Sequence, residues 1–148
     1  MKRYVYIVIA ILSGIFLSSC ENFDQETMVS GKVAYLIAYI DTVHNETTFV
    51  ETPAAGASLY LVSDPNSEYP YTGPTLETTS DSLGNYTFVV EPIANYEGFP
   101  KPSNIGVKVQ AWYFDDLLGP GYGEVSGYSI TPGKDASLPT IYLEHQVE

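Results

Sequence analysis

The sequence is poor in the side chains that build disulfides and nitrogen- or sulfur-ligated metal sites. It has one cysteine, Cys20, and two histidines, His44 and His145, among 148 residues. One thiol cannot form an internal disulfide, and neither histidine has a second ligand at a recognisable spacing. We therefore interpret both histidines as surface residues and expect neither a metal site nor a cofactor.

Positive charge is equally scarce. The chain has 6 Lys and Arg against 18 Asp and Glu, which gives a formal net charge of −12. The acidic residues are scattered, as on a solvated surface. Electrostatic binding to nucleic acid or to anionic lipid requires clustered basic residues, so we expect no nucleic-acid partner.

Catalytic motifs are also missing. The sequence contains no Gly-x-Ser-x-Gly nucleophile turn and no glycine-rich phosphate loop after a strand. Two groups of oxygen ligands, Asp115-Asp116 near Gly119 and Asp64 with Asn66 and Glu68, resemble calcium ligands. Neither has EF-hand spacing, so we interpret both as solvated loops. These absences predict that the chain is not an enzyme.

The N-terminus has the features of an export signal. Lys2 and Arg3 precede an apolar run over residues 4–17, which is too short to span a bilayer comfortably. Leu17-Ser18-Ser19-Cys20 follows and resembles a bacterial lipobox. The resemblance implies cleavage before Cys20 and acylation of that residue, and several acyl chains would anchor the protein stably to a membrane.

The predicted division of the chain is a lipoprotein signal peptide over residues 1–19, an acylated cysteine with a flexible tether over 20–27, and one domain over 28–148. The acidic residues just after Cys20 resemble the export tag of surface lipoproteins in some Gram-negative bacteria. We expect a protein that is lipid-anchored in the outer membrane, on its periplasmic side or at the cell surface.

The rest of the sequence predicts an all-β domain. Short stretches of alternating apolar and polar residues are separated by Gly and Pro, and no segment has a sustained helical period. Ile105, Val107, Val109 and Ala111 give the clearest alternation. The predicted fold is a single seven-stranded antiparallel β-sandwich. The predicted strands cover residues 29–40, 57–61, 76–80, 86–90, 105–114, 125–131 and 138–143.

Some local features are also expected. Gly84 should supply a positive φ in the turn after residues 76–80. Leu36, Ala38 and Ile40 make the end of the first strand apolar on both faces, so we expect that end to be covered on both sides or to pair across a corner. We interpret residues 41–53 as a polar connection, and residues 64–74, 92–103 and 115–123 as loops.

Several short motifs resemble the carboxypeptidase regulatory-like domains, whose sandwich is of the transthyretin (prealbumin-like) and Cna-B type. The most specific of them is Asp81-x-x-Gly84-x-Tyr86-x-Phe88, and the resemblance extends over about residues 28–144. It implies a spacer, stabilising module or binding domain. The connection over 41–53 is longer than the family's usual turn.

Aromatic side chains are the best candidates for ligand binding. Five are expected in loops and two, Trp112 and Phe114, on the outward face of a strand. Clustered exposed aromatics form interaction surfaces, whereas dispersed ones cap the ends of a sandwich. The candidate residues are Tyr69, Tyr71, Tyr96, Phe99, Trp112, Phe114 and Tyr122.

Two functions are favoured from the sequence, and a third, a hydrolase, would require a cleft with a paired acid and base. The first is a lipid-anchored envelope protein that acts as a structural or protein-interaction module. The second is a glycan- or peptide-binding accessory of an outer-membrane uptake system, which would use the loop aromatics. Thr42 and Ser82 also lie in Asp-Ser/Thr-apolar patterns that resemble bacterial O-glycosylation sites.

Overall fold

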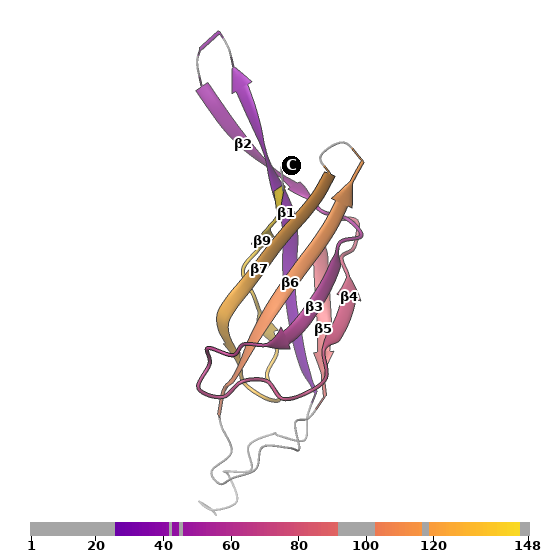
Figure 1. Ribbon diagram of the computed structural model, residues 1–148, viewed down its shortest axis with the longest axis vertical. Coiled ribbons are helices and arrows are strands. Elements are labelled where there is room, and N and C mark those ends of the chain that lie inside the picture. The colour runs from indigo at the N-terminus through magenta and orange to yellow at the C-terminus, as the bar shows by residue number, and fades with distance from the viewer. Residues whose placement is uncertain (1–25, 42, 45, 92–102, 117–118, 146–148) are drawn as a thin grey trace, which may run out of the picture.

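The structure is a computed structural model that describes residues 26–41, 43–44, 46–91, 103–116 and 119–145. These parts of the chain are all-β and contain no helix, and they form two sheets that pack as a sandwich (Figure 1). The all-β sandwich prediction is confirmed. The predicted signal peptide and Cys20 lie outside the described residues, and the count of seven strands stays a prediction.

The first sheet is built around the long strand β1. β2 and β5 pair with different parts of β1, and β1 also pairs with two short segments near the C-terminus. The members are β1 (Thr27–Asp41), β2 (Glu46–Pro53), β5 (Asn85–Val90), β8 (Ala136–Ser137) and β9 (Ile141–Tyr142).

The second sheet has the order β10-β7-β6-β3-β4, and all its pairings are antiparallel. Its members are β3 (Ser58–Ser63), β4 (Leu76–Thr79), β6 (Ile105–Asp115), β7 (Gly119–Ile130) and β10 (Glu144–His145). The expectation of a wholly antiparallel sandwich is wrong in the first sheet, because β8 and β9 run parallel to β1.

The core lies between the two sheets and is built by the alternation that the sequence indicated. Val107, Val109 and Ala111 of β6 are fully buried, while Trp112 and Phe114 of the same strand are exposed. In β5, Phe88 and Val90 are buried with Tyr86. The inward faces predicted for these two strands are therefore confirmed.

The turn before β5 is also as expected. Gly84 has φ of 79°, a left-handed conformation that side chains rarely adopt. A Cβ at this position would collide with the Val33 carbonyl oxygen. That close approach allows the Val33 N–H to donate to the Gly84 carbonyl over 2.8 Å. The turn thus fixes β5 against β1.

The interpretation of residues 41–53 as a polar connection is wrong. Residues 46–53 form β2, which pairs with β1 from Ala34 to Asp41 and makes a long hairpin. Figure 1 shows this hairpin projecting beyond the sandwich. Leu36, Ala38 and Ile40 are exposed there, so the expectation that this end of β1 is covered is also wrong. The polar residues of this segment gave no sign of a strand in the sequence, because β2 is defined only by its backbone pairing with β1.

The glycine-rich segment at 115–123 is mostly strand rather than loop. β6 extends to Asp115 and β7 begins at Gly119. A Cβ on Gly123 would approach the Tyr142 carbonyl oxygen to 2.6 Å and Ile141 Cγ2 to 2.8 Å. Glycine is therefore used at this position to let β7 pass closely over β9 and not to make a turn.

Candidate ligand-binding face

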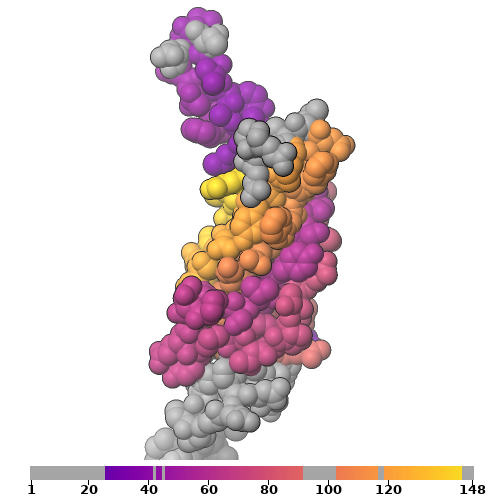
Figure 2. Space-filling view, viewed as in Figure 1, coloured from indigo at the N-terminus to yellow at the C-terminus, as the bar shows by residue number. Residues whose placement is uncertain are grey.

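The outer face of the second sheet carries three of the candidate aromatics. Trp112 and Phe114 of β6 have exposed fractions of 50% and 70%, because the buried residues that alternate with them point into the core. Tyr122 of β7 is half-buried and lies directly across from Trp112 in the ladder. We call this surface the β6–β7 face, and Figure 2 shows the second sheet from the side viewed in Figure 1.

Trp112 and Tyr122 form an aromatic pair. Their ring centroids are 4.4 Å apart, and the ring planes are tilted by 50°. Cross-strand aromatic neighbours stabilise a sheet and hold each other's orientation. Trp112 therefore remains half-exposed while its position is fixed by a neighbour.

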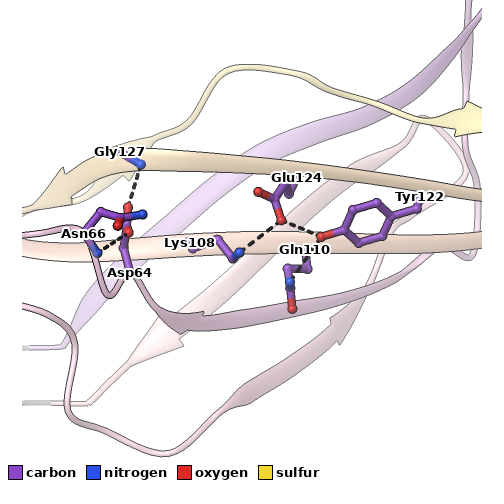
Figure 3. Close-up of polar contacts among 7 residues, drawn as sticks. All are labelled: Asp64, Asn66, Lys108, Gln110, Tyr122, Glu124 and Gly127. Carbon is purple, nitrogen blue, oxygen red and sulfur yellow. Dashed lines mark hydrogen bonds and ion pairs between the residues drawn. The ribbon is translucent and has the colours of Figure 1, made fainter.

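A polar network continues from Tyr122 along the same face (Figure 3). The Tyr122 hydroxyl donates to Glu124 Oε2 over 2.5 Å and accepts from Gln110 Nε2 over 3.1 Å. Lys108 Nζ lies 3.1 Å from the same Glu124 oxygen. Four side chains from two neighbouring strands are thus held in one arrangement.

The network sets the protonation states of its members. The Tyr122 hydroxyl, followed by Lys108, holds the pKa of Glu124 below its usual range. The hydrogen bond to Glu124 raises the pKa of Lys108. Burial, together with the bond to Glu124, raises the pKa of Tyr122. At neutral pH the face therefore presents a carboxylate, an ammonium group and a neutral phenol.

The β6–β7 face extends onto the next strands. Tyr60 of β3 lies across from Gln110 and donates to Glu77 Oε1 of β4 over 3.3 Å. A shallow hollow beside Trp112 is lined by Gly56, Ser58 and Phe114 together with Ala55 and Tyr113. Aromatic rings and hydrogen-bonding groups are therefore interleaved across four adjacent strands.

The other candidate aromatics do not join this face. Tyr71 is 4% exposed and donates its hydroxyl to the Pro74 carbonyl over 3.1 Å, so the structure places it in the core and not on this face. Tyr69 is exposed in the connection between β3 and β4. Tyr96 and Phe99 lie outside the described residues. Tyr122 belongs to a strand, although the Gly-rich sequence around it had suggested a loop.

Sequence reasoning missed the polar half of the face. Lys108 and Gln110 alternate with the buried valines of β6, so their outward direction was already implied. Glu124 and Tyr60 could not be connected to them, because only the pairing of β3, β6 and β7 makes them neighbours.

Asp64 is not part of a solvated acidic loop, contrary to the interpretation from sequence. It is 1% exposed, and its carboxylate accepts the N–H groups of Gly127 over 2.7 Å and Asn66 over 3.0 Å (Figure 3). The Gly127 bond, followed by the Asn66 bond, holds the pKa of Asp64 below its usual range. Asp64 thus ties the connection after β3 to β7.

Two further features concern the described residues as a whole. No group of three or more His, Cys, Asp or Glu residues there lies close enough together to hold a metal ion. In the same part of the chain, no helix is long and apolar enough to cross a membrane.

No protein-family model matches the chain, and a search of curated proteins finds no match. Among solved structures, the chain is similar to the crystal structure of a 9R-lipoxygenase from Cyanothece PCC8801. The sequence identity is 16% and the TM-score is 0.39, and the match covers 85% of this chain and 18% of that one.

The lipoxygenase match corrects one expectation. Because the matched structure is that of an enzyme, the prediction that this chain is not an enzyme is withdrawn. At a TM-score of 0.39 the likeness carries no argument for lipoxygenase chemistry in this chain. The chain spans less than one fifth of that structure, and we assign no reaction to it.

Proposed function

We propose that the protein is a lipid-anchored envelope lipoprotein that binds a glycan chain on its β6–β7 face. The observation that carries this proposal is the Trp112–Tyr122 pair, held beside Gln110, Glu124 and Lys108 on an exposed sheet surface. The C–H faces of a sugar ring pack on aromatic rings, while fixed polar groups bind its hydroxyls.

The charge of the face indicates which glycans suit it. Lys108 is paired with Glu124, while Glu77 and Glu144 add further negative charge on β4 and β10. An acidic surface repels sulfated or uronic acid chains. The proposed ligand is therefore a neutral polysaccharide, bound across several strands.

The sequence supports the anchor in this proposal. Leu17-Ser18-Ser19-Cys20 has the lipobox pattern, and the described sandwich begins at β1 only a few residues later, at Thr27. A short tether to an acylated Cys20 would keep the β6–β7 face within reach of the outer membrane. The resemblance to carboxypeptidase regulatory-like domains is consistent with such a binding module.

Affinity electrophoresis would test glycan binding. Residues 21–148, which include every described residue, would be run through gels containing neutral polysaccharides such as β-glucan, xylan and mannan. We expect retardation by at least one of them and its loss in Trp112→Ala. Tyr39→Ala is the matched control, because Tyr39 is 56% exposed but lies on the hairpin. Equal mobility of Trp112→Ala and the unmodified protein on every polysaccharide would refute the proposal.

A structural or protein-interaction module is the second candidate function. The observation that favours it is the β1–β2 hairpin, which exposes Tyr39, Ile40 and Phe49 away from the sandwich. Apolar side chains on a protruding element are typical of protein contacts.

A further inference from the structure

The outer part of the β1–β2 hairpin has no sheet neighbours among the described residues. β5 pairs with β1 only as far as Lys32, and β9 only as far as Ala34. Beyond these points β1 pairs with β2 alone, up to the pair Asp41 and Glu46. Figure 1 shows the resulting two-stranded ribbon extending past the sandwich.

This ribbon is apolar on both faces. Ile40 and Phe49 share one face and are 69% and 64% exposed, and Tyr39 and Val50 on the other are 56% and 43% exposed. A two-stranded ribbon is marginally stable in water, and three or more strands make a stable sheet. The ribbon therefore gains from the addition of strands.

The outer edge of β2 is suited to strand addition. The Ala54 N–H donates to the Val33 carbonyl of β1. Because the backbone groups of successive residues point to opposite sides of a strand, this hydrogen bond determines which residues of β2 turn theirs toward β1. Thr48, Val50 and Thr52 turn their backbone groups toward β1, so Thr47, Phe49 and Glu51 turn theirs outward. These outward groups form an open edge of the kind that pairs with another strand.

We propose that β2 pairs antiparallel with β2 of a second copy of this chain, about a two-fold axis at Phe49. In this register Phe49 faces Phe49 of the partner subunit, and Thr47 faces the partner's Glu51. Thr48 then faces the partner's Val50 and Glu46 faces the partner's Thr52. The product is a four-stranded sheet that contains both hairpins.

The side chains along the edge favour this register, because the two Phe49 rings face each other. No glutamate faces another glutamate, and Glu51 is already paired with Lys32 Nζ at 2.5 Å and accepts from the Tyr142 hydroxyl at 3.0 Å. A two-fold axis at Val50 would instead place Phe49 opposite a charged Glu51 of the partner subunit. Aromatic pairs stabilise a ladder, whereas an aromatic opposite a carboxylate does not.

A charge-swap experiment tests the proposed axis. Because residue 49 faces its own copy only in this register, Phe49→Lys and Phe49→Glu should each be monomeric in light scattering after size exclusion. An equimolar mixture of the two should form a heterodimer, and the unmodified protein (residues 21–148) should be a dimer. Phe114→Lys, which changes an exposed ring on the β6–β7 face, should remain dimeric.

Two results of that experiment would overturn the proposal. One is a monomeric unmodified protein at all concentrations up to several hundred micromolar. The other is a mixture of the Lys and Glu variants that stays monomeric, which would mean that residue 49 does not face itself.

Disulfide trapping gives an independent test that does not require a charged variant to fold. Residues 21–148 contain no cysteine, so Phe49→Cys has a single thiol. Facing residues of a hydrogen-bonded antiparallel pair have Cα atoms about 5.5 Å apart, within disulfide range. Mild oxidation should trap a covalent dimer of Phe49→Cys and not of Phe114→Cys. Equal trapping of the two variants would contradict the proposal.

Discussion

At the scale of single residues, the packing around Gly31 explains a polar group left inside the core. Tyr86 of β5 faces Gly31 of β1, and a Cβ on Gly31 would collide with the Tyr86 ring and hydroxyl. The ring thus fills the space that a side chain at residue 31 would occupy. Its hydroxyl is buried without a hydrogen-bond partner among the described residues, and burial raises the pKa of Tyr86.

Tyr86→Phe should therefore leave the protein as stable or make it more stable. The change removes a buried hydroxyl that lacks a partner and keeps the ring that covers Gly31, and an unsatisfied buried group costs about 1–3 kcal/mol. We expect the free energy of unfolding in urea to rise by up to about 1 kcal/mol. A loss above about 1 kcal/mol would mean that the hydroxyl has a partner. Phe88→Leu, a change in a neighbouring core ring, is a control and should destabilise the protein.

Asp64 should give the protein part of its sensitivity to acid. Its pKa in the folded state is lowered, so the stability that it contributes is present above its unfolded pKa of about 3.9. That contribution is lost as the pH falls through the folded pKa. Asp64→Asn should be destabilised at pH 7, and its difference from the unmodified protein should shrink below about pH 4.

Urea unfolding at pH 7, 5, 3.5 and 2.5 would check this prediction. Glu68→Gln is the matched control, because it removes a carboxylate that is exposed in the same connection. If the stability of Asp64→Asn falls with acid as steeply as that of the unmodified protein, Asp64 does not contribute to the acid response.

At the scale of elements, the strands that could be predicted from the sequence are those with one buried face. β5 and β6 were predicted well because each alternates between the core and an outer face. β2 was missed because nearly all its side chains are exposed and its alternation has no buried side to detect. The start of β7 was missed because its closely spaced glycines resemble a loop in sequence, although Gly123 serves close packing against β9.

The outer hairpin should contribute little to the stability of the sandwich. Ile37 packs against the core, whereas the described residues between Ala38 and Phe49 are exposed. Replacing residues 38–49 with Asn-Gly would join the facing residues Ile37 and Val50 through a two-residue turn. We expect the free energy of unfolding of the monomer to change by less than about 1 kcal/mol. A loss of several kcal/mol by urea titration at low protein concentration would show that the hairpin supports the core.

At the scale of the whole molecule, the fold class followed from the sequence but the candidate face only in part. Trp112 and Phe114 were identified from their place opposite the buried side of β6. Tyr122, Glu124 and Tyr60 are neighbours only because strands distant in sequence pair with β6, which no local pattern specifies. The order of the sheet was therefore the missing information.

The proposed membrane anchor can be tested with a protein that includes residues 1–19. Expressed in a Gram-negative host, it should sediment with the outer membrane, and its N-terminal peptide should carry diacylglycerol and acyl chains on Cys20. Cys20→Ser should move the protein out of the membrane fraction, as judged by fractionation and mass spectrometry. Ser19→Ala keeps a small residue before the cysteine and should remain anchored. An unmodified Cys20 in the mature protein would exclude the lipoprotein assignment.

The position of the one tryptophan has a practical consequence for optical measurements. Trp112 is half-exposed on the β6–β7 face and lies outside the core. Its emission in the native state should therefore already resemble that of a partly hydrated indole and change little on denaturation. An occupied face would dehydrate the same ring and shift its emission to shorter wavelength. In this protein, tryptophan fluorescence should thus report occupancy of the surface, and circular dichroism should report folding.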